Sequence, residues 1–413
     1  MFFFYQISLI LLIFLSPFIV LFRIFKKKED KFRFIEKFGL FTKKRKLGNI
    51  IWFHVSSVGE LMSIIPLLYH YENKKKINQI LVTTNTLSSA NIIKKYKFKK
   101  TIHQFFPIDS IFISQKFLNY WKPKIAIFVE SEIWPGIFYS LSKKNIPIVL
   151  LNARITEKTY KRWFSFKNFS YSVFKNIVRS YPQNYESIKY LRKLKVKNIK
   201  YIGNLKFSEN PFDKKDTLNK QLNLKFKSYN NWVAASTHDN EEIICATAHK
   251  ILKNKIKNLI TIIIPRHVNR VDAIISEIKK LKLTVVRHSE KVKNLENVDI
   301  YLVDTYGESK KFYKITNTVF LGGSLIKHGG QNPLEPARYG ARILHGSNVQ
   351  NFKDIYKFLH NLSVSKNINN AAQLASSILF RPTKNKNNRI KQLGKKILIK
   401  TAKELDTLIK NAI

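Results

Sequence analysis

The first residue that could do chemistry is Glu60, an acid that follows the apolar run 50–53. Gly59 permits a tight turn just before it, so Glu60 would begin a helix whose dipole favours the ionised carboxylate. A carboxylate held there could act as a general base. The alternative is a helix charge that contributes only a few tenths of a kcal/mol to stability.

Two further acids, Glu130 and Glu132, follow directly after the apolar run 125–129. Buried carboxylates are costly unless they are paired or hydrogen-bonded, so acids at the end of a strand mark a possible site. Asn152 and Arg154, after the next apolar run, add an amide and a cation. These residues predict a polar site in the first half of the chain.

The second half carries residues suited to binding a nucleotide. Arg266 places a cation at the end of an apolar run, and a glycine turn with an acid lies at 304–308. The segment 322–337 contains two glycine pairs and two prolines that fit the first turn of a helix. The amides at such a helix start can hold a phosphate, and Glu335 could accept hydrogen bonds from ribose hydroxyls.

Several common signatures are missing from the sequence. It has no Walker A loop, no Gly-x-Gly-x-x-Gly and no Gly-x-Ser-x-Gly, which weakens nucleotide triphosphatase, dehydrogenase and α/β-hydrolase interpretations. One cysteine, Cys245, excludes a disulfide framework and a thiolate metal cluster and fits a reducing compartment. No histidine and acid cluster has metal-ligand spacing, so we expect no catalytic metal and no cofactor.

The elements that must position these residues are strands and helices in alternation. Short apolar runs alternate with longer basic amphipathic stretches, which is typical of a parallel sheet covered by helices. The runs lie at 50–53, 80–83, 125–129 and 146–151, and then at 232–235, 259–264, 284–286, 299–303, 319–321 and 342–344. We therefore predict two doubly wound, Rossmann-like α/β domains facing a cleft, with ligands at the carboxyl ends of the strands.

The charge is strongly positive. Lys plus Arg is 74 and Asp plus Glu is 27, which gives a formal charge of +47. Such an excess indicates an anionic partner, either nucleic acid or a membrane surface, although lysine-rich coding composition accounts for part of it. The basic residues are spread throughout and form no nucleic-acid-binding pattern, so we expect a membrane surface rather than nucleic acid.

The N-terminus predicts a membrane anchor. Residues 2–22 carry no charged side chain, and a helix of roughly 20 residues crosses a bilayer of about 30 Å. Basic residues follow this run rather than precede it, so the rest of the chain is expected on the cytoplasmic side of the membrane. The alternatives are a helix lying in the membrane interface and a buried core helix.

Ten segments occur in an order that resembles bacterial 3-deoxy-D-manno-octulosonic acid (Kdo) transferases. They are residues 52–60, 83–86, 106–109, 130–135, 152–154, 203–206, 235–238, 265–267, 304–308 and 322–337. The resemblance covers nearly the whole chain, including the N-terminal run. It implies a GT-B glycosyltransferase fold, CMP-Kdo as donor, the lipid A precursor as acceptor, and work on the inner leaflet in lipopolysaccharide biosynthesis.

The resemblance also implies roles for individual residues. Glu60 matches the family's proton acceptor, and Glu130 and Lys206 match its transition-state stabilisers. The segments that match its CMP-binding positions are Pro265 and Arg266, then Tyr306, Gly307 and Glu308, and finally Asn332, Pro333, Leu334 and Glu335.

Three departures from the family pattern fall outside these residues. Gln331 stands where a histidine is usual, Gly136 where an asparagine is usual, and residues 239–240 are also atypical. Two rival functions stay open: a GT-B glycosyltransferase that uses another nucleotide sugar, and a membrane-anchored nucleic-acid binder.

Basic and aromatic residues alternate over 156–175, directly after the strand that ends near Arg154. This pattern predicts one helix of about five turns whose aromatic side chains enter the headgroup region. Its cations would meet anionic phosphates of the membrane or acceptor; they are Lys158, Lys161, Arg162 and Lys167. The alternative is an ordinary packed helix with solvated lysines.

These patterns divide the chain into five parts. The predicted parts are an anchor at 1–28, an acceptor-binding domain at 29–207, a linker at 208–231, a CMP-Kdo-binding domain at 232–390 and a C-terminal helix at 391–413.

Overall fold

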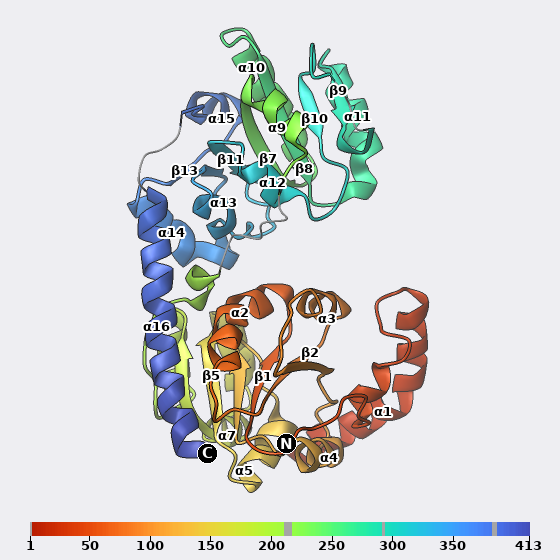
Figure 1. Ribbon diagram of the computed structural model, residues 1–413, viewed down its shortest axis with the longest axis vertical. Coiled ribbons are helices and arrows are strands. Elements are labelled where there is room, and N and C mark those ends of the chain that lie inside the picture. Colours follow the sequence, from red (N-terminus) through yellow and green to blue (C-terminus); the bar gives the residue numbers. More distant parts are fainter. Residues whose placement is uncertain (1, 210–216, 291–293, 382–385) are drawn as a thin grey trace. The chain divides into compact units, whose positions relative to one another are not determined.

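The computed structural model describes residues 2–209, 217–290, 294–381 and 386–413. The chain forms two compact units, the first made of residues 1–209 and 393–413 and the second of residues 210–392. Each unit contains one parallel β-sheet with helices packed against it (Figure 1). The prediction of two doubly wound α/β domains is confirmed.

The sheet of the first unit has six parallel strands in the order β3-β2-β1-β4-β5-β6. The strands are β1 (Ile50–Val55), β2 (Gln79–Thr84), β3 (Thr101–Phe105), β4 (Ile125–Val129), β5 (Ile148–Ala153) and β6 (Ile177–Pro182). The strand order reverses between β1 and β4, and such a switch point is where open α/β sheets bind ligands. Glu60 follows β1 and Glu130 follows β4, so both catalytic candidates flank this point.

Helices cover both faces of this sheet, which explains the continuous apolar strands. Every residue of β1 and β4 is buried. Trp52 of β1 packs its ring 4.9 Å from that of Phe117 and 5.2 Å from that of Phe128. The helices are α2 (Val58–Glu72), α3 (Leu87–Ile93), α4 (Ile111–Trp121), α5 (Pro135–Lys143), α6 (Glu157–Phe164), α7 (Lys167–Phe174) and α8 (Tyr185–Lys193), with short turns η1 (Phe34–Phe38) and η2 (Leu205–Ser208).

The sheet of the second unit has seven parallel strands in the order β13-β12-β11-β7-β8-β10-β9. The strands are β7 (Asn230–Thr237), β8 (Leu259–Pro265), β9 (Val285–Arg287), β10 (Ile300–Leu302), β11 (Thr318–Leu321), β12 (Arg342–His345) and β13 (Ser365–Asn367). The order reverses between β7 and β11, which makes this the switch point of the second unit.

The helices of the second unit complete its layers. They are α9 (Lys220–Lys227), α10 (Glu241–Lys253), α11 (Val271–Lys280), α12 (Ser309–Tyr313), α13 (Leu334–Arg338), α14 (Lys353–Asn361) and α15 (Ala371–Ser377), with turns η3 (Val268–Arg270), η4 (His288–Glu290) and η5 (Gln350–Phe352). Part of the predicted linker, 210–216, lies outside the described residues, and α9 and the start of β7 occupy its later part. The C-terminal helix α16 (Lys386–Ala412) begins before the predicted position 391.

The first helix, α1 (Phe2–Phe25), exposes many apolar side chains, among them Phe14, Phe18 and Phe22. Within the described part of the chain, no single helix is long and apolar enough to cross a membrane. The segments 4–11 and 13–25, bent by 45° from each other, meet the requirement by length and composition as a pair. The anchor therefore stays a prediction.

The beginning of α1 contacts the loop that starts α4. The Tyr5 hydroxyl donates to Asp109 Oδ2 at 2.6 Å, and Gln6 Oε1 accepts the N–H of Ile111 at 3.0 Å. Asp109 also accepts the N–H groups of Gly136 and of the residue after it, at the start of α5. Removing α1 would leave this buried carboxylate without one of its donors.

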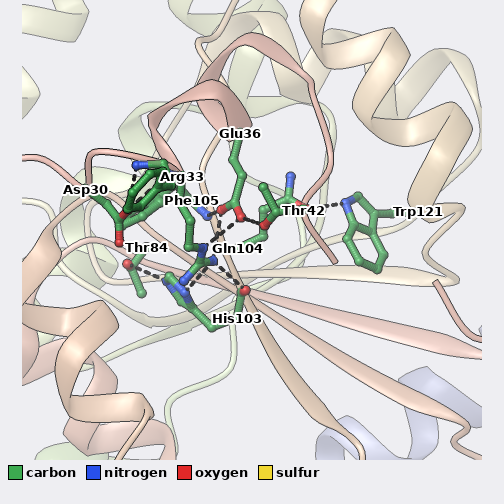
Figure 2. Close-up of polar contacts among 10 residues, drawn as sticks. Asp30, Arg33, Glu36, Thr42, Thr84, His103, Gln104, Phe105 and Trp121 are labelled. Atoms are coloured by element: carbon green, nitrogen blue, oxygen red, sulfur yellow. Dashed lines mark hydrogen bonds and ion pairs between the residues drawn. The ribbon is translucent and has the colours of Figure 1, made fainter. Parts of the chain in front are cut away.

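A buried polar network fastens the segment after α1 to the edge strand β3 (Figure 2). Arg33 donates to Glu36 Oε1 at 2.8 Å and to the carbonyl of His103 at 2.8 Å. Glu36 Oε2 accepts the N–H of Phe105 at 2.7 Å, and Thr84 Oγ1 lies 2.9 Å from His103 Nε2. Glu36 is fully buried, so the fold depends on these partners.

The single helix predicted over 156–175 is wrong, because the chain forms α6 and α7 instead. Phe166 between them has φ −122° and ψ 60°, which is not helical. The Ser165 hydroxyl donates to the Lys161 carbonyl at 2.9 Å. Serine side chains that bond to the backbone in this way compete with helix continuation.

Candidate active site

Glu60 lies in the first turn of α2, as predicted. The Ser57 hydroxyl caps the helix by accepting the N–H of Glu60 at 3.2 Å. In return, the Glu60 carboxylate accepts the N–H of Ser56 at 2.7 Å and the hydroxyl of Ser57 at 3.0 Å. This arrangement resembles a capping box, so Glu60 also has the structural role that the alternative interpretation gave it.

The surroundings of Glu60 suit proton transfer near neutral pH. Burial, aided by the negative charges of Glu130 and Glu132, raises the pKa of Glu60 to about 7, against the lowering effect of its bonds to Ser56 and Ser57. Glu60 as a whole residue is 9% exposed. A carboxylate that gains and loses a proton near the working pH is suited to general base catalysis.

Glu130 and Lys206 form an ion pair, with Lys206 Nζ 2.5 Å from Glu130 Oε1. Glu130 directly follows β4 and has φ +59°, a conformation uncommon outside glycine and often found at functional sites. Lys206 lies in η2, far along the chain from β4. The structure thus brings together the two residues predicted as transition-state stabilisers.

Asn152 holds this pair in place, a role that the sequence did not reveal. Its Oδ1 accepts the N–H of Leu205 at 2.9 Å, and its Nδ2 lies 3.5 Å from Glu130 Oε1. Asn152 is buried and has φ +51° at the end of β5. One side chain therefore links the turn that carries Lys206 to the carboxylate that Lys206 meets.

Glu132, the second acid after β4, is tied into the protein by two rings. His54 Nε2 lies 3.1 Å from Glu132 Oε2, and Trp134 Nε1 donates to the same oxygen at 3.0 Å. Burial lowers the pKa of His54, although Glu132 acts in the opposite direction. His54 is a site residue that was not predicted from the sequence. A histidine within the otherwise apolar strand β1 was the feature that could have indicated it.

The residues predicted to bind CMP all lie in the second unit. Pro265 ends β8 and is buried, whereas Arg266 after it is exposed. Tyr306 is 71% exposed, and Gly307 has φ +86°. Glu308 pairs with Lys311 at 2.7 Å.

An ion pair joins α12, the helix that follows 306–308, to the segment 332–335. Lys310 Nζ, in the helix after Glu308, lies 3.7 Å from Glu335 Oε1. Asn332 Oδ1 accepts the N–H of Leu334 at 3.1 Å, so this asparagine caps the turn that holds Pro333 and Leu334. The N–H of Leu334, one of the amides predicted to bind a phosphate, is therefore already hydrogen-bonded to a side chain.

Glu241 organises the loop after β11, and the sequence did not suggest this. Its fully buried carboxylate accepts the N–H groups of His238 at 3.0 Å and Gly323 at 2.7 Å. It also accepts those of Ser324 at 3.1 Å and Leu325 at 3.0 Å. The amides of this glycine loop are thus occupied by the protein's own carboxylate.

The four cations predicted for docking are exposed on α6 and at the start of α7; they are Lys158, Lys161, Arg162 and Lys167. Lys161 pairs with Glu157 at 2.8 Å. Phe164 and Phe166 are exposed, whereas Trp163 packs against the core of the first unit. Part of the aromatic pattern therefore serves packing.

Comparison with known proteins agrees with the resemblance. A model of the family 3-deoxy-D-manno-octulosonic-acid transferase (kdotransferase) matches residues 32–209. The 3-deoxy-D-manno-octulosonic acid transferase of Rickettsia bellii is 30% identical over 90% of this chain and 89% of that protein. That of Rickettsia felis is 31% identical over 83% of this chain and 74% of that protein.

A solved structure shares the fold. The crystal structure of a glycosyltransferase from Rickettsia africae has a TM-score of 0.55 at 12% identity and covers 89% of this chain and 99% of its own. The predicted GT-B glycosyltransferase class is confirmed. The fold and the sequence relatives lead to one conclusion: this chain belongs to the family of 3-deoxy-D-manno-octulosonic acid transferases, and it is a glycosyltransferase.

Proposed function

We propose that this enzyme moves Kdo from CMP-Kdo to a hydroxyl of the lipid A precursor in lipopolysaccharide biosynthesis, with Glu60 as general base. The observation that carries the proposal is the pKa of Glu60, about 7, beside the Lys206–Glu130 ion pair. The acceptor hydroxyl must lose its proton as the bond from Kdo to CMP breaks. Glu60 can take that proton at neutral pH.

Charge develops on two groups during this reaction. The Kdo carbon becomes positive as the bond to phosphate breaks, and the carboxylate of Glu130 is suited to stabilise it. Lys206 holds that carboxylate at 2.5 Å. The departing phosphate becomes more negative, and Arg266 is an exposed cation that can meet it.

The binding of CMP is assigned to the second unit. The residues proposed to hold it are Pro265, Arg266, Tyr306, Gly307, Glu308, Asn332, Pro333, Leu334 and Glu335. Glu335 and Glu308 are suited to accept hydrogen bonds from the ribose hydroxyls. In nucleotide-binding folds, a carboxylate accepts two hydrogen bonds from the vicinal hydroxyls of the ribose. The reaction needs no further cofactor in this proposal.

The enzyme is proposed to work at the cytoplasmic face of the inner membrane. The exposed phenylalanines of α1 and the exposed cations of α6 support this. Apolar side chains enter the acyl region, and cations bind anionic lipid or the phosphates of the acceptor. Lys158, Arg162 and Lys167 are the strongest candidates, since Lys161 already pairs with Glu157.

The proposal is tested with the full chain, CMP-Kdo and the tetraacyl disaccharide precursor of lipid A. Mass spectrometry should show a lipid product heavier by one or more Kdo residues, together with released CMP. A UDP-sugar offered in place of CMP-Kdo should give no product. Transfer from the UDP-sugar alone would replace this proposal with a different glycosyltransferase activity.

A further inference from the structure

Three histidines of the second unit converge on one point that the proposed reaction does not use. The ring of His238, after β7, lies with its centroid 4.3 Å from that of His328, in the loop after β11. His267, after β8, lies 5.8 Å from His238. The three rings come from three separate loops.

These loops lie at the switch point of the second sheet. β7 and β11 are neighbours at the place where the strand order reverses. His238 follows β7, and His328 follows β11, so both are at the carboxyl ends of these strands. Open α/β sheets bind their ligands at this location.

His238 lacks a partner that its burial calls for. The residue is 8% exposed, and its Nε2 is buried without a hydrogen-bond partner in the described part of the chain. A buried polar atom with no partner costs free energy, and ligands often supply the missing partner. The backbone N–H of His238 is already bonded to Glu241.

Gly323 lies directly beside this nitrogen. A Cβ placed on Gly323 would lie 3.3 Å from His238 Nε2 and 3.1 Å from His328 Cδ2. Gly323 also has φ +66°, which disfavours other residues. The loop backbone therefore approaches the unpartnered nitrogen closely, at a position where a side chain would crowd both rings.

Two arginines lie near the ring of His238. Arg266 lies close enough for its charge to act on His238, and it forms no ion pair within the described residues. Arg270 is nearby but pairs with Asp239 at 2.7 Å and Glu242 at 3.1 Å. The carboxylate of Glu241, which accepts the backbone N–H of His238, is occupied by four backbone amides.

The imidazole of His238 is neutral in this arrangement. Burial first, and then the neighbouring His328, His267, Arg266 and Arg270, lower the pKa of His238 to about 4. An anion placed beside these groups would act in the opposite direction and raise the pKa of His238.

We propose that His238 and His328, with Arg266, form an oxyanion site that holds the donor. The inference rests on the proposed donor, whose oxyanions are the phosphate of the nucleotide and the carboxylate of the acidic sugar. His238 would donate through Nε2, so the site would fix the donor at the bond that breaks. This assigns a binding role to a histidine pair to which the family resemblance gives none.

The test is calorimetry of the full chain with cytidine, CMP and CMP-Kdo, comparing wild type with His238→Phe. The control is His360→Phe, an exposed histidine on α14 of the same unit. We expect a loss of roughly 10-fold or more in affinity, the range for a hydrogen bond to a charged group. If the variant binds CMP and CMP-Kdo more weakly but cytidine with unchanged affinity, His238 contacts the phosphate. If only the affinity for CMP-Kdo falls, His238 contacts the carboxylate of the sugar.

Other results overturn the inference. Unchanged affinity for all three ligands removes His238 from the site, and an equal loss that includes cytidine shows a structural role. His328→Phe replaces His238→Phe if thermal unfolding shows that the latter does not fold. Wild type that binds no CMP contradicts the proposed donor instead. In that case, inorganic phosphate is titrated while the His238 ring is followed by NMR, and an unmoved ring signal rejects the oxyanion site.

Discussion

Lys206 Nζ lies 2.5 Å from Glu130 Oε1, although these residues are far apart in the sequence. Both side chains are largely buried, with 14% and 7% exposure. Glu130 in turn is the acid whose charge contributes most to the raised pKa of Glu60. The ion pair and Glu60 therefore form one electrostatic unit around the switch point of the first sheet.

The raised pKa of Glu60 predicts the pH dependence of the enzyme. A general base must be ionised, so kcat/KM should rise with pH through about 7. Glu130→Gln removes a negative charge near Glu60 and should move this limb to lower pH, whatever it does to the maximal rate. The matched control is Glu132→Gln, whose charge contributes less and should move the limb less.

The same pKa shift has a consequence for stability. The folded state holds the Glu60 proton more tightly than the unfolded chain does. The contribution of Glu60 to the free energy of unfolding therefore falls as pH rises from about 4.5 to about 7.

The pH dependence of the rate can also contradict the assignment. A wild-type profile of kcat/KM that is flat between pH 5 and 8 would show that Glu60 is not the titrating base.

Glu335 should matter for nucleotide binding. Glu335→Ala should weaken CMP binding by about 1.5–3 kcal/mol if it accepts hydrogen bonds from the ribose. Calorimetry with CMP measures this, and Glu290→Ala, an exposed acid of the same unit, controls for the change in net charge. Unchanged CMP affinity in Glu335→Ala would place the ribose elsewhere.

Reversing Lys158, Lys161 and Arg162 to Glu should raise the KM for the lipid acceptor and reduce binding to anionic vesicles, while CMP affinity stays constant. The full chain should be used, because α1 donates to the buried Asp109 through Tyr5. A matched control reverses three exposed lysines of the second unit, Lys279, Lys280 and Lys282. If both triple variants behave alike, α6 has no specific docking role.

The network in Figure 2 predicts a large stability effect. Glu36→Gln leaves Arg33 without its buried carboxylate partner and should cost about 3 kcal/mol or more in the free energy of unfolding. Denaturant unfolding followed by tryptophan fluorescence measures it. Glu157→Gln, which removes an exposed ion pair, should leave the transition in place. Equal stability of wild type and Glu36→Gln would show that the network is not needed.

The sequence predicted the central strands but not three edge strands. β3, β6 and β13 each lie at the edge of a sheet, where one side has no neighbouring strand. Their sequences mix polar and apolar residues, as in Thr101–Phe105 and Ser365–Asn367. Edge strands are often polar for this reason, so they lack the continuous apolar run that marked the others.

The sequence predicted the reactive residues of the candidate site but not the residues that hold them in position. Acids at strand ends and the family motifs identified Glu60, Glu130 and Lys206. The roles of Asn152 and Glu241 depend on bonds to the backbone of Leu205 and of the loop after β11. Such long-range bonds to backbone groups leave no spacing signal in the sequence, so only the fold reveals them.

In the proposed reaction, Glu60 takes the proton of the acceptor hydroxyl. The most direct test is the turnover of Kdo transfer in Glu60→Gln, which keeps the shape of the side chain and removes the proton acceptor. The matched variant Glu186→Gln changes an exposed acid of the same unit. We predict a loss of roughly 10²-fold or more in kcat for Glu60→Gln, with CMP affinity intact and Glu186→Gln unaffected. Turnover of Glu60→Gln close to that of wild type would contradict the role of Glu60 as general base.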